Sequence, residues 1–84
     1  MKRAAMVKAY VLVRLVPGFE SNAISQMSVI PGVKDIIVVF GRWDAIIQVE
    51  AKTLTELSRL MIGQIRGVQG VQATETLVAA ETSL

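Results

Sequence analysis

Two short segments carry residue types that can bind a small polar molecule. The first is Gly41-Arg42-Trp43-Asp44, which lies between two apolar runs. A glycine lets a ligand approach the backbone amides, a guanidinium can pair with a carboxylate, and an ionised aspartate accepts hydrogen bonds from an ammonium group. The tryptophan ring offers a flat apolar wall. These residues predict a ligand-binding hairpin, although the same types are also common in plain turns.

The second segment is Thr74-Glu75-Thr76, in the last apolar stretch of the chain. In an extended strand Thr74 and Thr76 project on the same face, so their hydroxyls can hydrogen-bond one polar ligand. Threonine is also common in strands that bind nothing. The candidate ligand-binding residues from the two segments are Gly41, Arg42, Trp43, Asp44, Thr74 and Thr76.

The composition argues against catalysis, metal binding and contact with nucleic acid. The chain of 84 residues has no cysteine and no histidine, which removes thiolate chemistry and the commonest general base and metal ligand. The seven acidic residues are dispersed and form no calcium-loop pattern. The net charge of +2 is small for a protein that must contact many phosphates. We therefore expect no enzyme activity, no metal, no cofactor and no direct nucleic-acid partner.

The elements that must position the candidate residues follow from turn residues and apolar periodicity. Alternating and β-branched stretches predict strands over residues 6–16, 33–40, 45–51 and 71–80. A first helix is predicted over residues 19–30, with an inner stripe of Ala23, Ile24, Met27 and Ile30. A second helix is predicted to begin with a capping box at Thr53 and Glu56. Its inner stripe is Leu54, Leu57, Met61 and Ile65.

This order of elements predicts a single domain over residues 1–84. A doubled β-α-β unit gives an α+β, ferredoxin-like β-α-β-β-α-β sandwich, with both helices on one face of a four-stranded antiparallel sheet. Since 52% of the residues are hydrophobic, we expect the other face to be covered by a second copy, in a dimeric α/β barrel-type assembly. Alternation assigns to that face Tyr10, Leu12, Ile36, Val38, Phe40, Ile46 and Val78.

Charged residues interrupt every apolar run of the chain. A membrane-spanning helix needs about 20 consecutive apolar residues, and Lys8 and Arg14 interrupt any signal-like apolar segment near the start. We therefore expect a mature cytoplasmic protein that does not enter a membrane.

Several segments, in this order, resemble the ligand-binding domain of the Lrp/AsnC family, also called the RAM domain, for regulation of amino acid metabolism. They are Val-Leu-Val-Arg-Leu-Val-Pro-Gly at 11–18, Pro-Gly-Val-Lys at 31–34, Phe-Gly-Arg-Trp-Asp at 40–44 and Gly-Val-Gln-Ala-Thr-Glu-Thr-Leu-Val at 70–78. The resemblance implies dimers that pair through their sheets and form rings, such as octamers or decamers, with an amino acid effector between dimers. It places residues 41–44 in the effector loop and Thr74 and Thr76 in the terminal strand.

Family regulators carry a helix-turn-helix domain ahead of this module, whereas the first strand is predicted here at about residue 6. The resemblance therefore implies a stand-alone module without its own DNA-binding domain, linked to transcriptional regulation and able to partner a full-length Lrp/AsnC regulator. Two alternatives stay open. One is a small dimeric ferredoxin-like barrel enzyme acting on a hydrophobic substrate. The other is a ligand-free module that hetero-oligomerises with a full-length regulator.

Overall fold

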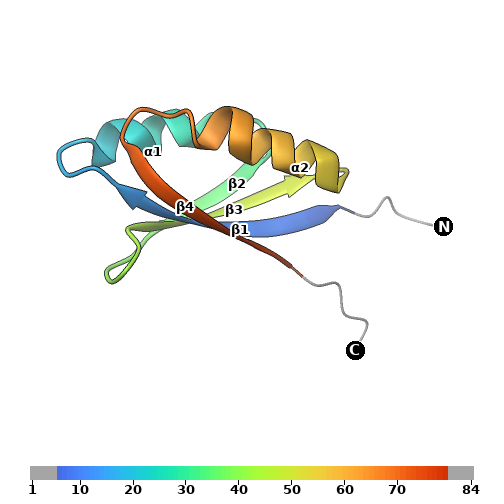
Figure 1. The fold of residues 1–84 in the computed structure, drawn as a ribbon, viewed down its shortest axis with the longest axis horizontal. Helices are drawn as coiled ribbons and strands as arrows, with labels where there is room; N and C mark the ends of the chain where they lie inside the picture. Colours follow the sequence, from blue (N-terminus) through green and yellow to red (C-terminus); the bar gives the residue numbers. More distant parts are fainter. Residues whose placement is uncertain (1–5, 80–84) are drawn as a thin grey trace.

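The computed structural model describes residues 6–79 of the chain. Its elements are β1 (Val7–Leu15), α1 (Glu20–Ser28), β2 (Val33–Val38), β3 (Ala45–Ala51), α2 (Leu54–Leu60), a π-helical turn η1 (Met61–Ile65) and β4 (Val71–Val78). The strands pair antiparallel in the order β2-β3-β1-β4. Both helices lie on one face of this sheet (Figure 1). The predicted ferredoxin-like order and architecture are therefore confirmed.

The core lies between the helices and the inner face of the sheet. From Ala9 to Leu15, every second residue of the central strand β1 is buried, because side chains alternate between the two faces of a strand. The buried strand residues are Ala9, Val11, Val13, Leu15, Ala45, Ile47 and Val49. The buried helix residues are Ala23, Met27, Leu57, Leu60 and Ile65. The inner stripe predicted for α1 is confirmed, with Ile24 and Ile30 packed against this core.

The second helix departs from prediction at one position of its inner stripe. Leu54 is 59% exposed, and Leu60 is buried instead. The helix ends in η1, where the Arg66 N–H donates to the carbonyl of Met61 (3.0 Å) in the i to i+5 pattern of a π-helix. One half of the predicted capping box is confirmed at the start of α2, where the Glu56 N–H donates to Thr53 Oγ1 (3.1 Å).

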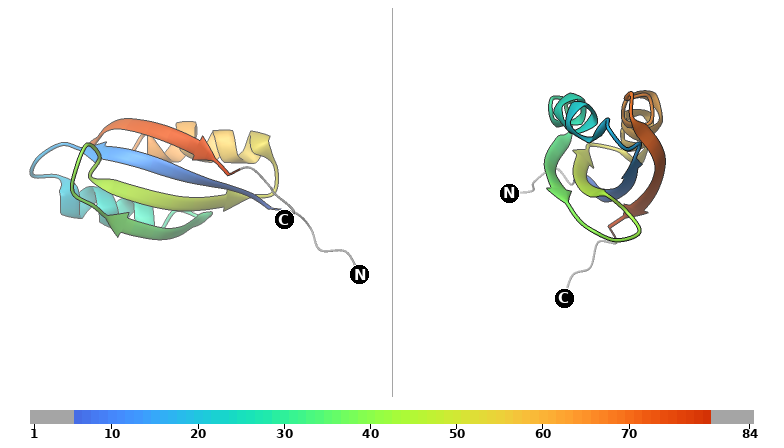
Figure 2. Two further views of the ribbon diagram at one scale, coloured as in Figure 1. Left: turned by 90° about the horizontal axis from the view of Figure 1, so that it is seen from below. Right: turned by 90° about the vertical axis from the view of Figure 1, so that its left-hand side faces the viewer.

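Among the described residues 6–79, neither helix lies over the outer face of the sheet (Figure 2). Directly paired residues of antiparallel strands share a face. Leu12 pairs with Ile46, and Tyr10 lies between Gln48 and Leu77, so the predicted outer positions of Tyr10, Leu12 and Ile46 are confirmed. We call the apolar residues of this face the outer patch, which consists of Tyr10, Leu12, Ile37, Ile46 and Leu77.

The prediction that Ile36 and Val38 belong to this face is wrong, and the prediction for Phe40 is not tested by the strand pairing. The register of β2 against β3 shifts around Lys34, and one extra residue turns every later side chain to the opposite face. Ile36 and Val38 consequently pair with inner-face residues of β3, and Ile37 takes the outer position. Phe40 lies beyond the end of β2 and is fully exposed.

The other edge strand, β4, shows the same effect. Its register against β1 shifts around Gln72, so the prediction that Val78 lies on the outer face is also wrong. Val78 pairs with the buried Ala9, and Leu77 and Glu75 take the outer positions. Bulges in both edge strands therefore decide which side chains the outer face presents.

Within residues 6–79, the helices are all too short or too polar to cross a membrane.

The turn before β4 supplies a first test of this packing. Gly70 has φ +102°, and a Cβ built on it would lie 2.7 Å from the Cβ of Phe19. Gly18 has a similar φ of +92° but nothing within 4 Å of that position. We expect Gly18→Ala to lower the free energy of unfolding by about 1–2 kcal/mol through backbone strain. Gly70→Ala should cost about 1–3 kcal/mol more, because overpacking adds to that strain.

Urea denaturation of both variants at one protein concentration measures this difference, since oligomerisation shifts apparent stability. Equal losses for Gly70→Ala and Gly18→Ala would contradict the packing of Gly70 against Phe19.

Candidate functional site

The 41–44 hairpin, which consists of Gly41, Arg42, Trp43 and Asp44, connects β2 to β3. It leaves the sheet on the side away from the helices (Figure 1). Gly41 has φ +149° with open space around it, and Arg42 is exposed. Trp43 and Asp44 are half-buried. The hairpin thus presents one solvent-facing half and one half that contacts the rest of the chain.

Asp44 is held by the end of β1 through main chain and side chain. Its N–H donates to the carbonyl of Val13 (2.8 Å), and its Oδ2 accepts a hydrogen bond from the N–H of Leu15 (2.7 Å). Its carbonyl also accepts from the N–H of Val39 (3.0 Å), which closes the hairpin. Asp44 therefore has a structural role in addition to any contact with a ligand.

Arg14 holds the other side of the hairpin. Its Nη2 donates to the carbonyl of Arg42 (2.9 Å), and its Cζ lies 5.4 Å from the centroid of the Trp43 ring. That distance is within the range of a cation–π interaction. Sequence reasoning missed Arg14, because only the pairing of Val13 with Ala45 brings the end of β1 beside the hairpin.

Thr74 and Thr76 lie on the inner, helix-facing side of β4. Thr74 pairs with Val13, and the Thr76 hydroxyl donates to Met61 Sδ (3.0 Å). Both threonines are half-buried. They share the hairpin's end of the sheet, because Val13 pairs with Ala45 as well as with Thr74. The hairpin, however, lies toward the outer face, so one chain alone does not bring the two predicted segments into one pocket.

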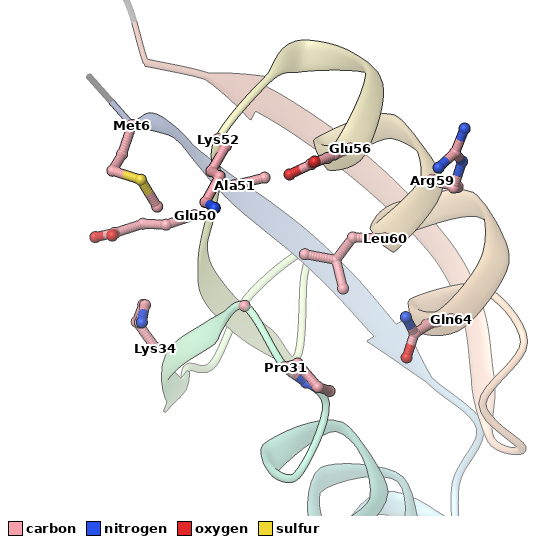
Figure 3. Close-up of a pocket in the computed structure, with 11 residues that line it drawn as sticks. Met6, Pro31, Lys34, Glu50, Ala51, Lys52, Glu56, Arg59, Leu60 and Gln64 are labelled. Carbon is pink, nitrogen blue, oxygen red and sulfur yellow. The ribbon is translucent and has the colours of Figure 1, made fainter. Parts of the chain in front are cut away.

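A separate hollow of about 400 Å³ lies at the opposite end of the sheet. Figure 3 shows it between the ends of β2 and β3 and the helix α2. Its charged lining residues are Lys34, Glu50, Lys52, Glu56 and Arg59. The sequence did not predict this hollow, because segments far apart in the chain form it. These charges are of both signs and mostly exposed, and an exposed ion pair typically contributes about 1 kcal/mol or less.

A shallow groove of about 550 Å³ runs along the outer side of α2 and η1. Its apolar lining comes from Leu54 and Ile62, which are 59% and 61% exposed. Over residues 6–79, His, Cys, Asp and Glu side chains form no group of three that could hold a metal ion.

Comparison with known proteins places nearly the whole chain in one family. A family model described as the Lrp/AsnC ligand binding domain matches residues 8–84. An uncharacterized HTH-type transcriptional regulator of Pyrococcus abyssi is 32% identical over 77 residues, which are 88% of this chain and 51% of the relative. This chain therefore spans about half the length of that regulator.

A homocitrate synthase of Sulfurisphaera tokodaii is 37% identical over 71 residues, which are 83% of this chain but 15% of the enzyme. The match is therefore confined to a small part of that enzyme.

Solved structures agree with the family match. The crystal structure of FFRP-DM1 has a TM-score of 0.84 at 32% identity and covers 88% of this chain and 99% of its own. A feast or famine regulatory protein from M. tuberculosis, complexed with L-methionine, has a TM-score of 0.75 at 22% identity. That match covers 90% of this chain and 51% of the M. tuberculosis chain. At that identity it shows a shared fold.

The hydrogen bond between Asp44 and Leu15 supplies a test of the hairpin's attachment. We expect Asp44→Ala to lower the free energy of unfolding by about 1.5–3 kcal/mol, the range for a hydrogen bond to a charged group. Asp44→Asn should cost less, because the amide oxygen can still accept from the Leu15 N–H. Urea denaturation measures both values.

Glu20→Ala is the matched control. Its Oε1 accepts from the nearby Gly18 N–H (2.9 Å) in an exposed, local contact, so its loss should stay below about 1 kcal/mol. A loss for Asp44→Ala no larger than that for Glu20→Ala would show that the Asp44 bond does not hold the hairpin.

Proposed function

Because the chain belongs to the family of Lrp/AsnC ligand-binding domains, we propose that it is an oligomeric module that binds an amino acid effector and is not itself an enzyme. The observation that carries this proposal is the 41–44 hairpin, which β1 holds from two sides while Gly41 and Arg42 stay exposed. A pre-organised loop of this kind binds a small ligand at a lower entropic cost than a mobile one.

The polar groups of the hairpin suit the two charged ends of an amino acid. Oδ2 of Asp44 accepts from the Leu15 N–H, so we assign the ammonium group of the effector to Oδ1 or to backbone carbonyls. The effector carboxylate would meet the loop amides or the guanidinium of Arg42. The family relative complexed with L-methionine supports an amino acid as the ligand class.

Thr74 and Thr76 enter the same site only through a second chain. They lie on the edge strand β4, on the opposite face of the sheet from the hairpin. We therefore propose that the effector binds where the hairpin of one dimer meets β4 of the next, in a ring of dimers such as an octamer or decamer. An effector that binds the ring better than the free dimer shifts assembly toward the ring.

The outer patch supports the sheet-to-sheet dimer from which such a ring would be built. Tyr10, Ile37 and Leu77 are 41%, 52% and 48% exposed in the single chain. A contiguous exposed apolar patch marks an interaction surface, and a second sheet would cover it at a spacing of about 10 Å.

The proposal also covers the location of the module in the cell and its regulatory partner. The module would act in the cytoplasm without contacting nucleic acid itself, and it would influence transcription through a full-length Lrp/AsnC regulator. The relative from Pyrococcus abyssi is a regulator of the HTH type and supports that link. The similarity to part of a homocitrate synthase also fits a regulatory module that occurs in different protein contexts.

Calorimetry with the twenty amino acids tests the site. We expect at least one to bind, and Asp44→Asn to weaken it about tenfold or more, since a hydrogen bond to a charged group contributes about 1.5–3 kcal/mol. Asp44→Asn is preferred to Asp44→Ala here, because the asparagine side chain keeps an oxygen that can accept from the Leu15 N–H. The control is Lys34→Ala in the separate hollow, which should bind as the wild type does.

If no amino acid binds, the proposed function is wrong. If Lys34→Ala weakens binding while Asp44→Asn does not, the ligand occupies the hollow of Figure 3 instead of the hairpin.

The dimer has its own test. Leu12→Lys places a charge in the middle of the outer patch, and burying an unpaired charge is costly. We expect light scattering to show dissociation of this variant to monomers at micromolar concentration. Val29→Lys is the control, because Val29 is 79% exposed and follows α1, away from the outer face. A wild-type chain that is monomeric at the same concentration would refute the dimer.

A further inference from the structure

We propose that Arg14 is a positioning residue that couples the outer face of the sheet to the 41–44 hairpin, so that dimer formation orders the effector site. The inference rests on the proposed function, because it takes the hairpin as the effector site and the outer patch as the dimer interface. Arg14 belongs to neither of the two segments that the sequence predicted to bind the ligand.

The position of Arg14 on the outer face follows from its neighbours. Val13 and Leu15 are buried on the inner face, so Arg14 between them projects to the outer face, where it pairs with Ala73 of β4. Leu12, a member of the outer patch, lies on the same face of the same strand. Arg14 is exposed in the single chain.

One rigid group makes both contacts with the hairpin. A guanidinium is planar, carries five N–H donors and stacks on aromatic faces. Here it donates to the Arg42 carbonyl at 2.9 Å and lies 5.4 Å from the centre of the Trp43 ring. It therefore fixes a backbone carbonyl and the next side chain relative to each other, which orients the loop amides between Gly41 and Asp44.

The next residue of β1 holds the hairpin by a different route. The Leu15 N–H donates to Asp44 Oδ2 at 2.7 Å. This contact is partly buried, so it depends little on what covers the outer face. The contacts of Arg14 are solvent-exposed, so their strength depends strongly on what covers the outer face. The hairpin consequently has a permanent attachment at Asp44, which bonds to both Val13 and Leu15, and an exposed attachment to Arg14 whose strength varies with its surroundings.

Covering the outer face would strengthen the variable attachment. A second chain on that face removes water from around Arg14, and cation–π contacts and hydrogen bonds are stronger when they are desolvated. The dimer would then hold Arg42 and Trp43 more firmly than the monomer does. Because coupling between two binding events is reciprocal, an effector bound at the hairpin would also stabilise the dimer.

Trp43 is the single tryptophan of the chain, so its fluorescence reports on this contact without any ligand. For the wild type, we expect dilution through the dimer dissociation range to shift Trp43 emission to longer wavelength. Arg14→Met keeps a long side chain but removes the cation and the donors. Its emission should already lie at the longer wavelength in the dimer, and dilution should change it little.

Arg14→Lys and Lys8→Met serve as the matched variants. Arg14→Lys keeps a positive charge but lacks the planar guanidinium, so it should recover part of the wild-type Trp43 emission. Lys8 lies on the outer face at the other end of β1, so its loss changes the same net charge without touching Trp43. We expect Arg14→Met to weaken amino acid binding about two- to fivefold, as for one exposed cation–π contact, and Lys8→Met to leave it unchanged.

The inference is overturned if Arg14→Met shows the wild-type Trp43 emission at every concentration, or if Lys8→Met changes it equally. These readouts need no effector. A wild-type chain that binds no amino acid overturns the proposed function instead, and the ligand-free emission then decides the positioning role of Arg14.

Discussion

The alternation of side chains along β1 is the constraint on which the rest of this structure depends. Its inner residues, from Ala9 to Leu15, are in the core and hold both helices on one face. Its outer residues, Tyr10, Leu12 and Arg14, face the side of the sheet opposite α1 and α2. Because β1 is also paired on both edges, it sets the register of β3 and β4 and brings the end of the strand beside the 41–44 hairpin.

That arrangement ties the candidate site to the core. Three successive residues at the end of β1 bond to the hairpin, Val13 and Leu15 through their main chain and Arg14 through its side chain on the outer face. The Asp44 end of the hairpin is therefore fixed as long as β1 stays packed. Apolar burial in the core is non-directional. Because it fixes β1, it also fixes the β1 groups that bond to the Arg42 carbonyl and the Asp44 carboxylate.

In the edge strands β2 and β4, the face of several side chains could not be predicted from the sequence. Strict alternation from Val33 and Val71 leads to the outer positions of Ile36, Val38 and Val78, and all three are inner-face residues because a bulge intervenes in each strand. A bulge inserts one residue without a strong sequence signal. It also explains why Thr74 and Thr76 face the helices, away from the hairpin with which the sequence had grouped them.

The amino-acid sequence is enough to predict the element order, the α+β ferredoxin-like class, the alternating face of β1, the stripe of α1 and the cap at Thr53. These depend on local periodicity and turn chemistry, which a single chain displays directly. It also singled out residues 41–44 as the most unusual segment. The contacts of Arg14 and Leu15 with that segment, and the position of the threonines on the other face, become visible only in the folded chain. Pairing register between distant strands sets those contacts, and a shift of one residue reverses them.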